Sequence, residues 1–429
     1  MTDPTHPGFR PRPRVAVIGG GVSGLTAAHL LQRTHEVTLF EADDRIGGHA
    51  HTHDVRLSDG STARVDSGFI VLNDRTYPTL RRLLDELGVR TRPTEMSMSI
   101  TCSGCGLSYV GGRGPNGIFA QRRRLLDPRF WRLLLGVRRF QRAAMTLLAD
   151  DPASELTYGG FLEREGFDAH FVTHYALPVV SCVWSMGHQA ALDYPAAYLF
   201  AFLRHHGFLA LGDAPTWHTV VGGSRSYVEK VTAGLDVVRS GTRVTAVSRK
   251  PDAVVLDDDH GEHHEFDHVV VATHADEALA LLTDADDAEQ EVLGAFGYST
   301  NVAWLHRDES VLPERRRGRA SWNYRLEDCD TPTDRTRVSY WMNRLQGHPE
   351  ADPVVVTLNP GAGDQPSGTI ATMTYQHPTY TAASVAAQQR LESLNGERLA
   401  FAGAYHGWGF HEDGCRAGVA AAEALGASW

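Results

Sequence analysis

Three histidines occupy alternate positions directly after a pair of glycines, in the stretch Gly47-Gly48-His49-Ala50-His51-Thr52-His53. In a strand, alternate side chains share one face, and imidazole is a common metal ligand. A metal centre also needs further ligands in a fixed geometry, and no nearby residue supplies them. We therefore interpret the histidines as hydrogen-bonded or solvent-facing side chains, with His49 beside a bound ligand, and predict no metal site.

A glycine-rich turn, Gly19-Gly20-Gly21-Val22-Ser23-Gly24, separates a short apolar run at 14–18 from a helical pattern at 25–31. In GxGxxG, the first glycine permits the tight turn, the second admits a pyrophosphate, and the third lets helix pack on strand. A second strand at 36–40 ends at Glu41, where a carboxylate can accept hydrogen bonds from ribose hydroxyls. The pattern predicts a dinucleotide-binding βαβ unit.

The residues after Glu41 decide which dinucleotide is expected. The spacing Glu41-x-x-x-Arg45-x-Gly47-Gly48 places a guanidinium and two more glycines beside the same phosphates. It is similar to the second signature of FAD proteins of the glutathione-reductase and amine-oxidase type. The chain has no second GxGxxG motif, so we predict FAD and no separate NAD(P)H site.

The strand patterns predict two domains that interleave along the chain. We expect strands at 242–247 and 253–256 as a hairpin, buried strands at 269–273 and 399–402, and a helix beginning near Asp413. The fold class is α/β: a Rossmann-like FAD-binding domain with an interleaved α+β substrate domain. The expected ranges are a disordered tail at 1–13, an FAD-binding domain at 14–80, 217–285 and 395–429, and a substrate-binding domain at 81–216 and 286–394.

Composition narrows the function classes. The 429 residues carry a formal net charge of -11, which argues against a nucleic-acid partner because phosphate binding needs a basic face. Five cysteines, no apolar leader and no apolar run near 18 residues predict a cytoplasmic protein. Cys102 and Cys105 form a CxxC pair that we interpret as a structural turn, since zinc would need a second pair and Cys182, Cys329 and Cys415 are single cysteines.

Several longer motifs carry a family resemblance from Arg14 to Leu425. They are GGGVSGL, EADDRIGGHAHTHDV, VDSGFIVLNDRTYPTL, PTWHTVVGGSRSYV, SWNYR, YWMNRLQ and FAGAYHGWGFHEDGCRAGVAAAEAL. Together they resemble the FAD-dependent amine-oxidase and phytoene-desaturase superfamily. Within it, the chain is similar to a flavoprotein family often found beside cyclopropane-fatty-acid-synthase-like methyltransferases.

The resemblance implies an FAD site that draws on all three segments of the nucleotide-binding domain. The residues it assigns to that site are Gly19, Gly21, Val22, Ser23, Gly24, Glu41, Ala42, Arg45, Gly47, Gly48, His49, Asp66, Ser67, Gly68, Phe69, Asn73, Val244, Thr273, Gly403, Phe410, His411, Glu412 and Asp413. A helix beginning at Gly414 would aim its positive end at the flavin N1 and C2 carbonyl, which stabilises the anionic reduced form.

Two positions depart from the superfamily pattern. Relatives commonly carry Asp or Glu after the glycine at 403, whereas this chain has Ala404, so Glu412 or Asp413 is expected to replace that contact. Flavin amine oxidases usually keep a lysine near flavin N5, but residues 286–394 contain none. This absence weakens ordinary amine oxidation.

The substrate side is expected to be apolar. Residues 122–148 combine apolar positions with arginines, which fits either an ordinary surface helix or a helix that contacts an anionic membrane or rims a lipid tunnel. Tyr405, Trp408 and Phe410 could wall a substrate pocket or belong to the core. His306 or His411 is the expected acid or base, because histidine titrates near neutral pH.

These observations favour an FAD-dependent oxidoreductase that passes hydride to flavin N5 from an unsaturated fatty-acyl or isoprenoid-like substrate. The reaction would form or shift a carbon–carbon double bond. A flavin amine oxidase is the second hypothesis, and a non-catalytic flavin-binding or lipid-carrier protein is the third. The expected partners are a small-molecule or lipid substrate and a membrane surface contacted through 122–148; the oligomeric state stays open.

Overall fold

A parallel five-stranded sheet forms the centre of the nucleotide-binding half. The structure is a computed structural model that describes residues 12–209, 214–330, 336–361 and 365–429, so most of the tail expected at 1–13 lies outside the described residues. The strand order is β10 (Val237–Arg239), β2 (Glu36–Phe40), β1 (Arg14–Ile18), β14 (His268–Val271) and β20 (Leu399–Phe401). Its central strands are buried along most of their length, as expected for parallel strands covered on both faces.

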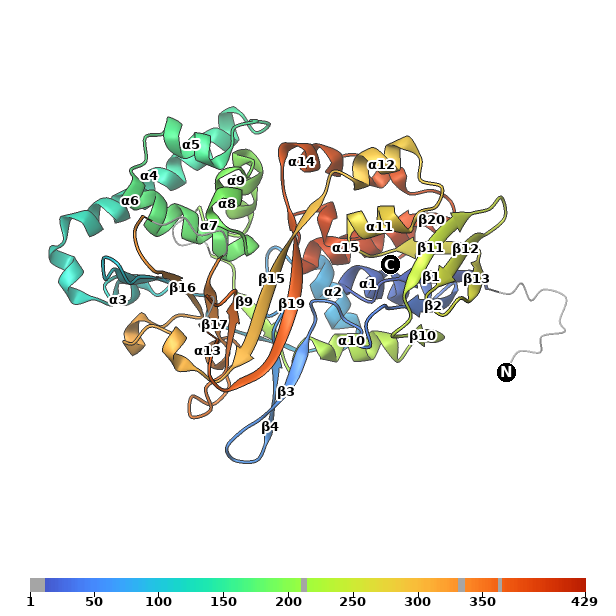
Figure 1. Ribbon diagram of the computed structural model, residues 1–429, viewed down its shortest axis with the longest axis horizontal. Helices are drawn as coiled ribbons and strands as arrows, with labels where there is room; N and C mark the ends of the chain where they lie inside the picture. The colour runs from blue at the N-terminus through green and yellow to red at the C-terminus, as the bar shows by residue number, and fades with distance from the viewer. Residues whose placement is uncertain (1–11, 210–213, 331–335, 362–364) are drawn as a thin grey trace.

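The helices of this half cover the sheet, and the first of them follows the glycine turn directly. They are α1 (Val22–Leu31), α2 (Pro78–Glu86), α10 (Arg225–Thr232), α11 (Ala275–Leu281), α12 (Asp287–Leu293), α14 (Ala382–Gln388) and α15 (His411–Ala424). α1 and α15 lie side by side in Figure 1, and a Cβ at Gly418 would come within 2.3 Å of the Ser23 carbonyl oxygen. Only glycine permits this close helix contact.

Three small sheets accompany the parallel sheet in the described residues. The hairpin expected at 242–256 forms as β11 (Val244–Arg249) and β12 (Val254–Asp258), and β13 (His263–Phe266) extends it. A second hairpin joins β3 (Thr52–Arg56) to β4 (Thr62–Asp66). A third small sheet, in the order β5 (Leu72–Asn73), β9 (Trp217–Val220) and β6 (Thr91–Pro93), connects the two halves.

A seven-stranded sheet forms one layer of the other half, and helices form the second layer. Its order is β19 (Thr369–Thr379), β15 (Gly297–His306), β18 (Val355–Leu358), β17 (Val338–Trp341), β16 (Trp322–Leu326), β7 (Met98–Cys102) and β8 (Ser108–Gly111). The long strands β15 and β19 run between the two halves in Figure 1. β7 and β16 pair in parallel although more than 200 residues separate them.

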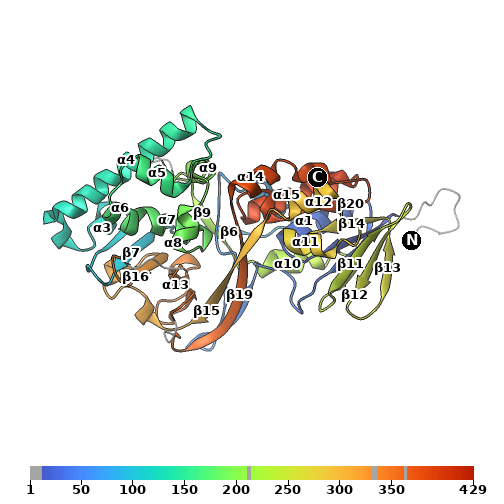
Figure 2. The same cartoon turned by 45° about the horizontal axis from the view of Figure 1, so that its top comes forward.

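A layer of helices covers this sheet, at the left of Figures 1 and 2. They are α3 (Gly114–Ile118), α4 (Pro128–Asp150), α5 (Tyr158–Arg164), α6 (Ala169–Phe171), α7 (Leu177–Trp184), α8 (His188–Leu192) and α9 (Ala196–His205), with α13 (Met342–Leu345) between β17 and β18. Among the described residues, none of the helices is both long enough and apolar enough to span a membrane. The fold is thus a Rossmann-like domain joined to an α+β domain, and the expected boundary at residue 80 falls inside α2.

Candidate functional site

The glycine turn at the end of β1 leaves open space in front of α1. Gly21 caps the helix with an extended backbone, no side chain accepts from the first-turn N–H groups, and a Cβ at Gly21 would meet nothing within 4 Å. A Cβ at Gly24, by contrast, would lie 2.0 Å from the Gly19 carbonyl oxygen. Helix N–H donors that face open space fit a pyrophosphate.

The loop after β2 closes the other side of this space. The Glu41 carboxylate accepts from the backbone N–H groups of Gly20 at 2.8 Å and Asp43 at 3.0 Å. Arg45 donates to the carbonyl oxygens of Gly48 at 2.7 Å and Ala50 at 3.2 Å. Arg45 therefore shapes the diglycine loop, and its expected place beside the phosphates of FAD stays a prediction.

Glycines in this loop also hold neighbouring segments close together. Gly48 has a φ of +55°, and a Cβ there would lie 3.3 Å from Gly21 Cα. A Cβ at Gly68 would come within 2.3 Å of the His49 carbonyl oxygen, so the 66–70 segment lies directly on the loop. The expected cofactor residues of both segments thus form one continuous wall.

Buried Asp66 fixes that wall to the rest of the molecule. Its carboxylate accepts from Thr52 Oγ1 at 2.6 Å, Ser224 Oγ at 2.7 Å and Gln346 Nε2 at 2.7 Å. Burial raises the pKa of Asp66 to about 6, although these hydrogen bonds oppose the shift. The network joins β3, β4, α10 and α13. The residues that directly follow Asp66, which are Ser67, Gly68 and Phe69, line a cavity.

Helix α15 presents its N-terminus to the same cavity. It begins at His411, three residues before the expected Gly414, because the Asp413 carboxylate accepts from the Phe410 N–H at 3.0 Å and closes an earlier first turn. The positive end of the helix therefore lies among cavity-lining residues, as a flavin-facing helix requires.

Glu412 and Asp413, which were expected to replace the acidic residue that relatives carry at position 404, both form hydrogen bonds within the fold. Glu412 accepts from the backbone N–H groups of Thr79 and Leu80 at 3.0 and 2.9 Å and so caps α2. Asp413 is held by the Phe410 N–H and by Arg416 at 3.3 Å. Both carboxylates are buried, and burial raises the pKa of Asp413 to about 6.

The cavity lies between the two halves and has about 1140 Å³ of space, part of it continuous with solvent. Aromatic and aliphatic side chains dominate its lining, which also includes four histidines. The lining residues are His49, Ser67, Gly68, Phe69, Ile70, Val71, Tyr77, Met96, Cys182, Val183, Trp184, Ser185, Phe202, His206, Phe208, Trp217, Trp322, Tyr340, Leu358, Tyr375, His377, Pro378, Trp408, Gly409, Phe410 and His411. None of these described residues is Asp, Glu, Lys or Arg.

Burial keeps the cavity histidines uncharged at neutral pH. It lowers the pKa of His411 to about 3 and that of His377 to about 4, with His274 adding to the shift at His377. His49 is lowered well below its usual pKa, first by burial and then by His377. The His411 ring stacks on Phe69 with centroids 3.7 Å apart, and its Nε2 lies 3.3 Å from the Tyr227 hydroxyl.

Of the expected acid–base pair His306 and His411 and the expected pocket residues Tyr405 and Trp408, one of each kind lines the cavity. Trp408 and His411 are lining residues, and the Trp408 Nε1 has no partner within the described residues. Tyr405, which could have walled a substrate pocket, belongs instead to the core of the nucleotide-binding half, where its ring packs on Phe296. His306 is corrected to a structural role, since Nε2 bonds Thr357 Oγ1 at 2.8 Å and Nδ1 accepts from the Asp308 N–H.

The remaining expected cofactor residues lie in several segments of the nucleotide-binding half. Thr273 follows β14 and its N–H lies near the Gly19 turn, while Val244 begins β11 and is buried. A Cβ at Gly403 would overlap the Tyr405 ring at 2.2 Å. Asn73 accepts from the N–H groups of Arg75 and Thr76 and so shapes the turn before α2.

His51 and His53 form hydrogen bonds within the fold. His51 Nδ1 lies 3.1 Å from the Tyr375 hydroxyl, and His53 Nε2 lies 2.8 Å from Ser67 Oγ. Tyr375 and His377 on β19 were missed as cavity residues, because nothing in the local sequence distinguishes them from other strand residues. Trp217 was also missed, although it lies in the quoted motif PTWHTVVGGSRSYV.

The site has three parts: the N-terminus of α1, which fits a pyrophosphate, the folded diglycine loop, and the aromatic cavity at the N-terminus of α15. Together they define a two-domain FAD-binding protein. Residues 22–367 of this chain match the family described as "Flavin containing amine oxidoreductase". The chain belongs to that family, and its cofactor is FAD.

Individual relatives differ in what their names describe. The chain is 27% identical over 271 residues to (S)-6-hydroxynicotine oxidase of Paenarthrobacter nicotinovorans, covering 60% of this chain and 59% of that protein. It is 39% identical over 84 residues to carotenoid phi-ring synthase of Streptomyces griseus, covering 19% of this chain and 16% of that protein. The chain thus covers less than two thirds of the length of either relative.

Solved structures agree on the fold. The CLA-producing fatty acid isomerase from P. acnes superposes with a TM-score of 0.67 at 18% identity, covering 96% of this chain and 98% of that one. Cyclohexylamine oxidase from Brevibacterium oxydans IH-35A gives a TM-score of 0.68 at 16% identity, covering 97% and 99%. At these identities the likeness concerns the fold alone.

Proposed function

We propose that this protein is an FAD-dependent oxidoreductase or isomerase that forms or shifts a carbon–carbon double bond in an unsaturated fatty-acyl or isoprenoid-like substrate. The observation that carries the proposal is the cavity lining, in which no described residue bears a charge. A buried cation needs a carboxylate partner, and a buried carboxylate needs a cation. An uncharged hydrocarbon segment needs neither.

The distribution of lysine supports the same substrate class. Lys230 donates to the carbonyl oxygens of Leu87 and Gly88, Lys250 directly follows β11, and neither lysine of the chain lines the cavity. The lysine that flavin amine oxidases usually keep near the flavin therefore has no substitute here. This favours hydrocarbon chemistry over amine oxidation.

FAD, when bound, supplies a hydride acceptor at N5. The protein's own residues exclude water with an aromatic wall and offer neutral imidazoles for proton transfer. The His411 Nε2 and the Tyr227 hydroxyl share a hydrogen bond, so a proton taken up by the ring can be held between them. Burial lowers the pKa of His411 to about 3, so the ring would hold such a proton only briefly before passing it on.

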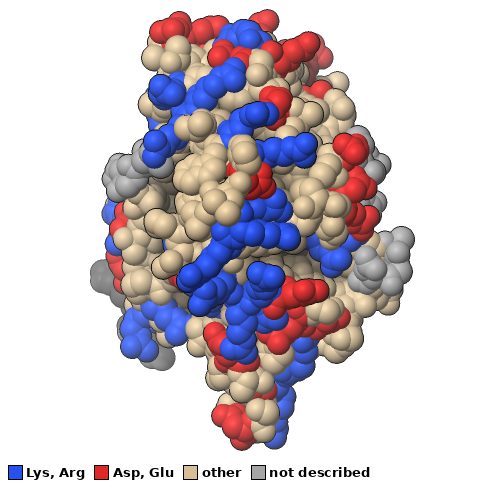
Figure 3. Space-filling view, turned by 90° about the vertical axis from the view of Figure 1, so that its left-hand side faces the viewer, with Lys and Arg blue, Asp and Glu red and all other residues tan. Residues whose placement is uncertain are grey.

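The cavity mouth supports access for a lipid chain. Phe208 lines the cavity and is 37% exposed, and its carbonyl oxygen accepts from Gln141 of α4 at 3.2 Å. Leu126 is 90% exposed, Leu135 64% and Trp131 45%, all in or next to α4. Figure 3 shows basic side chains gathered with uncharged surface over this end of the molecule. We propose that the surface at 122–148 contacts an anionic membrane.

Two of the similar proteins have names that describe reactions on lipids or isoprenoids, which supports the proposal. A fatty acid isomerase and a carotenoid phi-ring synthase are among the similar proteins, beside several amine oxidases. We also propose that the chain belongs to the flavoprotein family found beside cyclopropane-fatty-acid-synthase-like methyltransferases, which would provide a lipid setting.

The function is tested by mixing the FAD-loaded protein with vesicles of unsaturated phospholipid under anaerobic conditions. Desaturation is expected to bleach the flavin in proportion to product, because the electrons have no acceptor. Isomerisation is expected to move double bonds, seen by mass analysis, while the flavin stays oxidised at steady state. Bleaching by amines with unchanged lipid would establish the amine oxidase instead. A flavin that no donor reduces would favour the non-catalytic carrier.

A carboxylate placed in the cavity is expected to impair this reaction. Met96 lines the cavity and is half-buried, so Met96→Glu adds a charge without a large change in volume. Desolvating that charge beside an acyl chain is expected to lower kcat/KM by about tenfold or more. Ile370→Glu, at an exposed position on β19 outside the cavity, is the matched control. Equal loss in both variants would contradict the assigned cavity.

Membrane contact is tested separately. The double variant Leu126→Asp/Leu135→Asp removes exposed apolar surface and adds negative charge, so partition onto anionic phospholipid vesicles is expected to fall by about tenfold or more. Co-sedimentation measures this partition, and Ile370→Asp should leave it unchanged. Wild-type protein that stays in the supernatant would rule out the contact.

A further inference from the structure

Four metal-binding side chains from three distant segments meet at the end of the molecule that carries α3 and α6. The Cys3His cluster consists of Cys102, Cys105, His174 and Cys329, whose ligand atoms all lie within 4.8 Å of one another. The expectation that Cys329 is an isolated cysteine is therefore wrong. Its Sγ lies 3.8 Å from Cys102 Sγ, because β16 pairs in parallel with β7 and both strands end at the same edge.

The distances within the cluster match tetrahedral coordination. Cys105 Sγ lies 3.4 Å and Cys329 Sγ 3.6 Å from His174 Nε2. A tetrahedron with ordinary zinc–sulfur and zinc–nitrogen bonds separates two sulfurs by roughly 3.8 Å and sulfur from nitrogen by roughly 3.6 Å. A sulfur–sulfur separation of 3.8 Å is also far too long for a disulfide bond.

The histidine is oriented as a ligand. His174 Nδ1 lies 2.9 Å from the His170 carbonyl oxygen, so Nδ1 carries the proton and Nε2 turns its lone pair toward the sulfurs. The Tyr109 hydroxyl donates to the His174 carbonyl oxygen at 2.8 Å and anchors this segment to β8. His174 lies in the π-helix η2 (Val172–Ala176), a conformation that often marks functional sites.

The turn between the first two cysteines is shaped for close approach. A Cβ at Gly104 would come within 2.9 Å of Asp328 Cα, so a glycine lets the turn reach the segment that carries Cys329. Gly106, directly after Cys105, has a φ of +62°.

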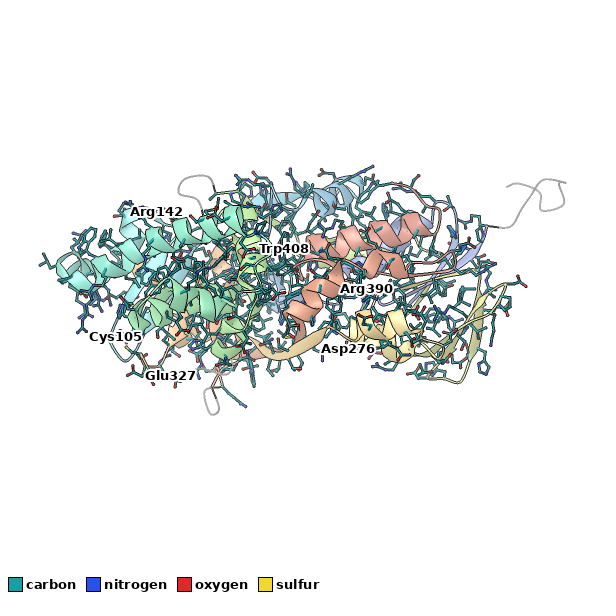
Figure 4. The ribbon with its side chains drawn as sticks, turned by 90° about the horizontal axis from the view of Figure 1, so that it is seen from above. Cys105, Arg142, Asp276, Glu327, Arg390 and Trp408 are labelled. Carbon is teal, nitrogen blue, oxygen red and sulfur yellow. The ribbon has the colours of Figure 1, made fainter. Side chains whose placement is uncertain are left out.

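We propose that the Cys3His cluster binds one structural zinc ion. Four protein ligands complete the coordination shell and leave no open position, which is typical of structural zinc sites and not of catalytic ones. Figure 4 shows Cys105 toward one end of the molecule, away from the cavity residue Trp408. The ion would tie β7, η2 and the segment after β16 together and thereby brace the helical layer on the seven-stranded sheet.

The zinc content of the purified full-length, FAD-loaded protein tests this site. We expect about one zinc per chain by plasma mass spectrometry. Cys105→Ser changes one atom at an exposed position and is expected to lose most of the zinc and to lower Tm, while flavin absorbance per chain stays unchanged. Ser103→Ala, in the same turn, should keep both zinc and Tm.

Two measurements on the wild-type protein cover the case that a variant misfolds. Chelator treatment should release the zinc and expose three additional thiols to a thiol reagent, and added Zn²⁺ should protect them again. Replacement by Co²⁺ should give the absorption bands of tetrahedral thiolate coordination. Wild-type protein with no more zinc than Cys105→Ser, or with Cys102 and Cys329 recovered as a disulfide, would overturn the proposal.

Discussion

A Gly21→Val variant is expected to fold normally and to be purified without its yellow cofactor. A Cβ at this position meets nothing within 4 Å, and the backbone φ of -73° suits any residue, so the fold tolerates the change. The new side chain would occupy the space in front of the α1 N–H groups. Losing two charge-assisted hydrogen bonds to a pyrophosphate costs about 3 kcal/mol, so we expect FAD affinity to fall by about 100-fold or more.

Titration of the FAD-free protein with FAD, followed by flavin fluorescence, measures this loss. Circular dichroism and the urea midpoint of the FAD-free variant report whether it folds. Gly396→Val is the matched control, because a Cβ there is also nearly unobstructed but lies in an exposed loop before β20. If Gly21→Val binds FAD as tightly as Gly396→Val does, the pyrophosphate is held elsewhere.

Replacing Asp66 is expected to cause a large loss of stability. Asp66→Ala leaves the Ser224 N–H and the Gln346 side-chain amide without a buried acceptor, which costs about 2–4 kcal/mol in total. Urea unfolding followed by tryptophan fluorescence measures the change. Asp54→Ala is the control, because Asp54 is half-exposed and pairs with Arg225 at the surface, where an ion pair contributes under about 1 kcal/mol.

The Asp66 effect has a defined pH dependence. The folded-state pKa of about 6 lies above the ordinary 3.8, so the folded protein holds this proton more tightly than the unfolded chain does. Asp66 therefore contributes most to stability below pH 4, and this contribution declines as the pH rises through 6. The difference in unfolding free energy between wild type and Asp66→Ala should be larger at pH 5 than at pH 8. A difference that grows toward pH 8 would contradict the raised pKa.

The nucleotide-binding half could be predicted because its signals are local. The apolar run at 14–18, the glycine turn and the strand ending at Glu41 each follow from a few neighbouring residues, and β1 and β2 match the expected ranges. The assignment to the FAD-dependent amine-oxidase superfamily and FAD as the cofactor were confirmed for the same reason. α15 began earlier than expected because a side-chain cap, which the apolar pattern does not reveal, sets its first residue.

The substrate half could be predicted only in outline. Its sheet brings strands together across more than 200 residues, and no local pattern specifies that β7 lies beside β16. His306 was expected near the flavin because it lies on the right strand, but its position at the end of β15 places it in the sheet core. The same long-range pairing brings Cys329 to the CxxC turn, which counting cysteines along the sequence did not indicate.

The parallel sheet has a consequence for synthesis on the ribosome. β20 lies beside β14 at one edge and is translated long after it. α15, which packs on α1, follows it still later. A nascent chain therefore carries an exposed β14 edge and an uncovered α1 until β20 and α15 have left the exit tunnel. Cofactor capture should accordingly await the emergence of these two segments.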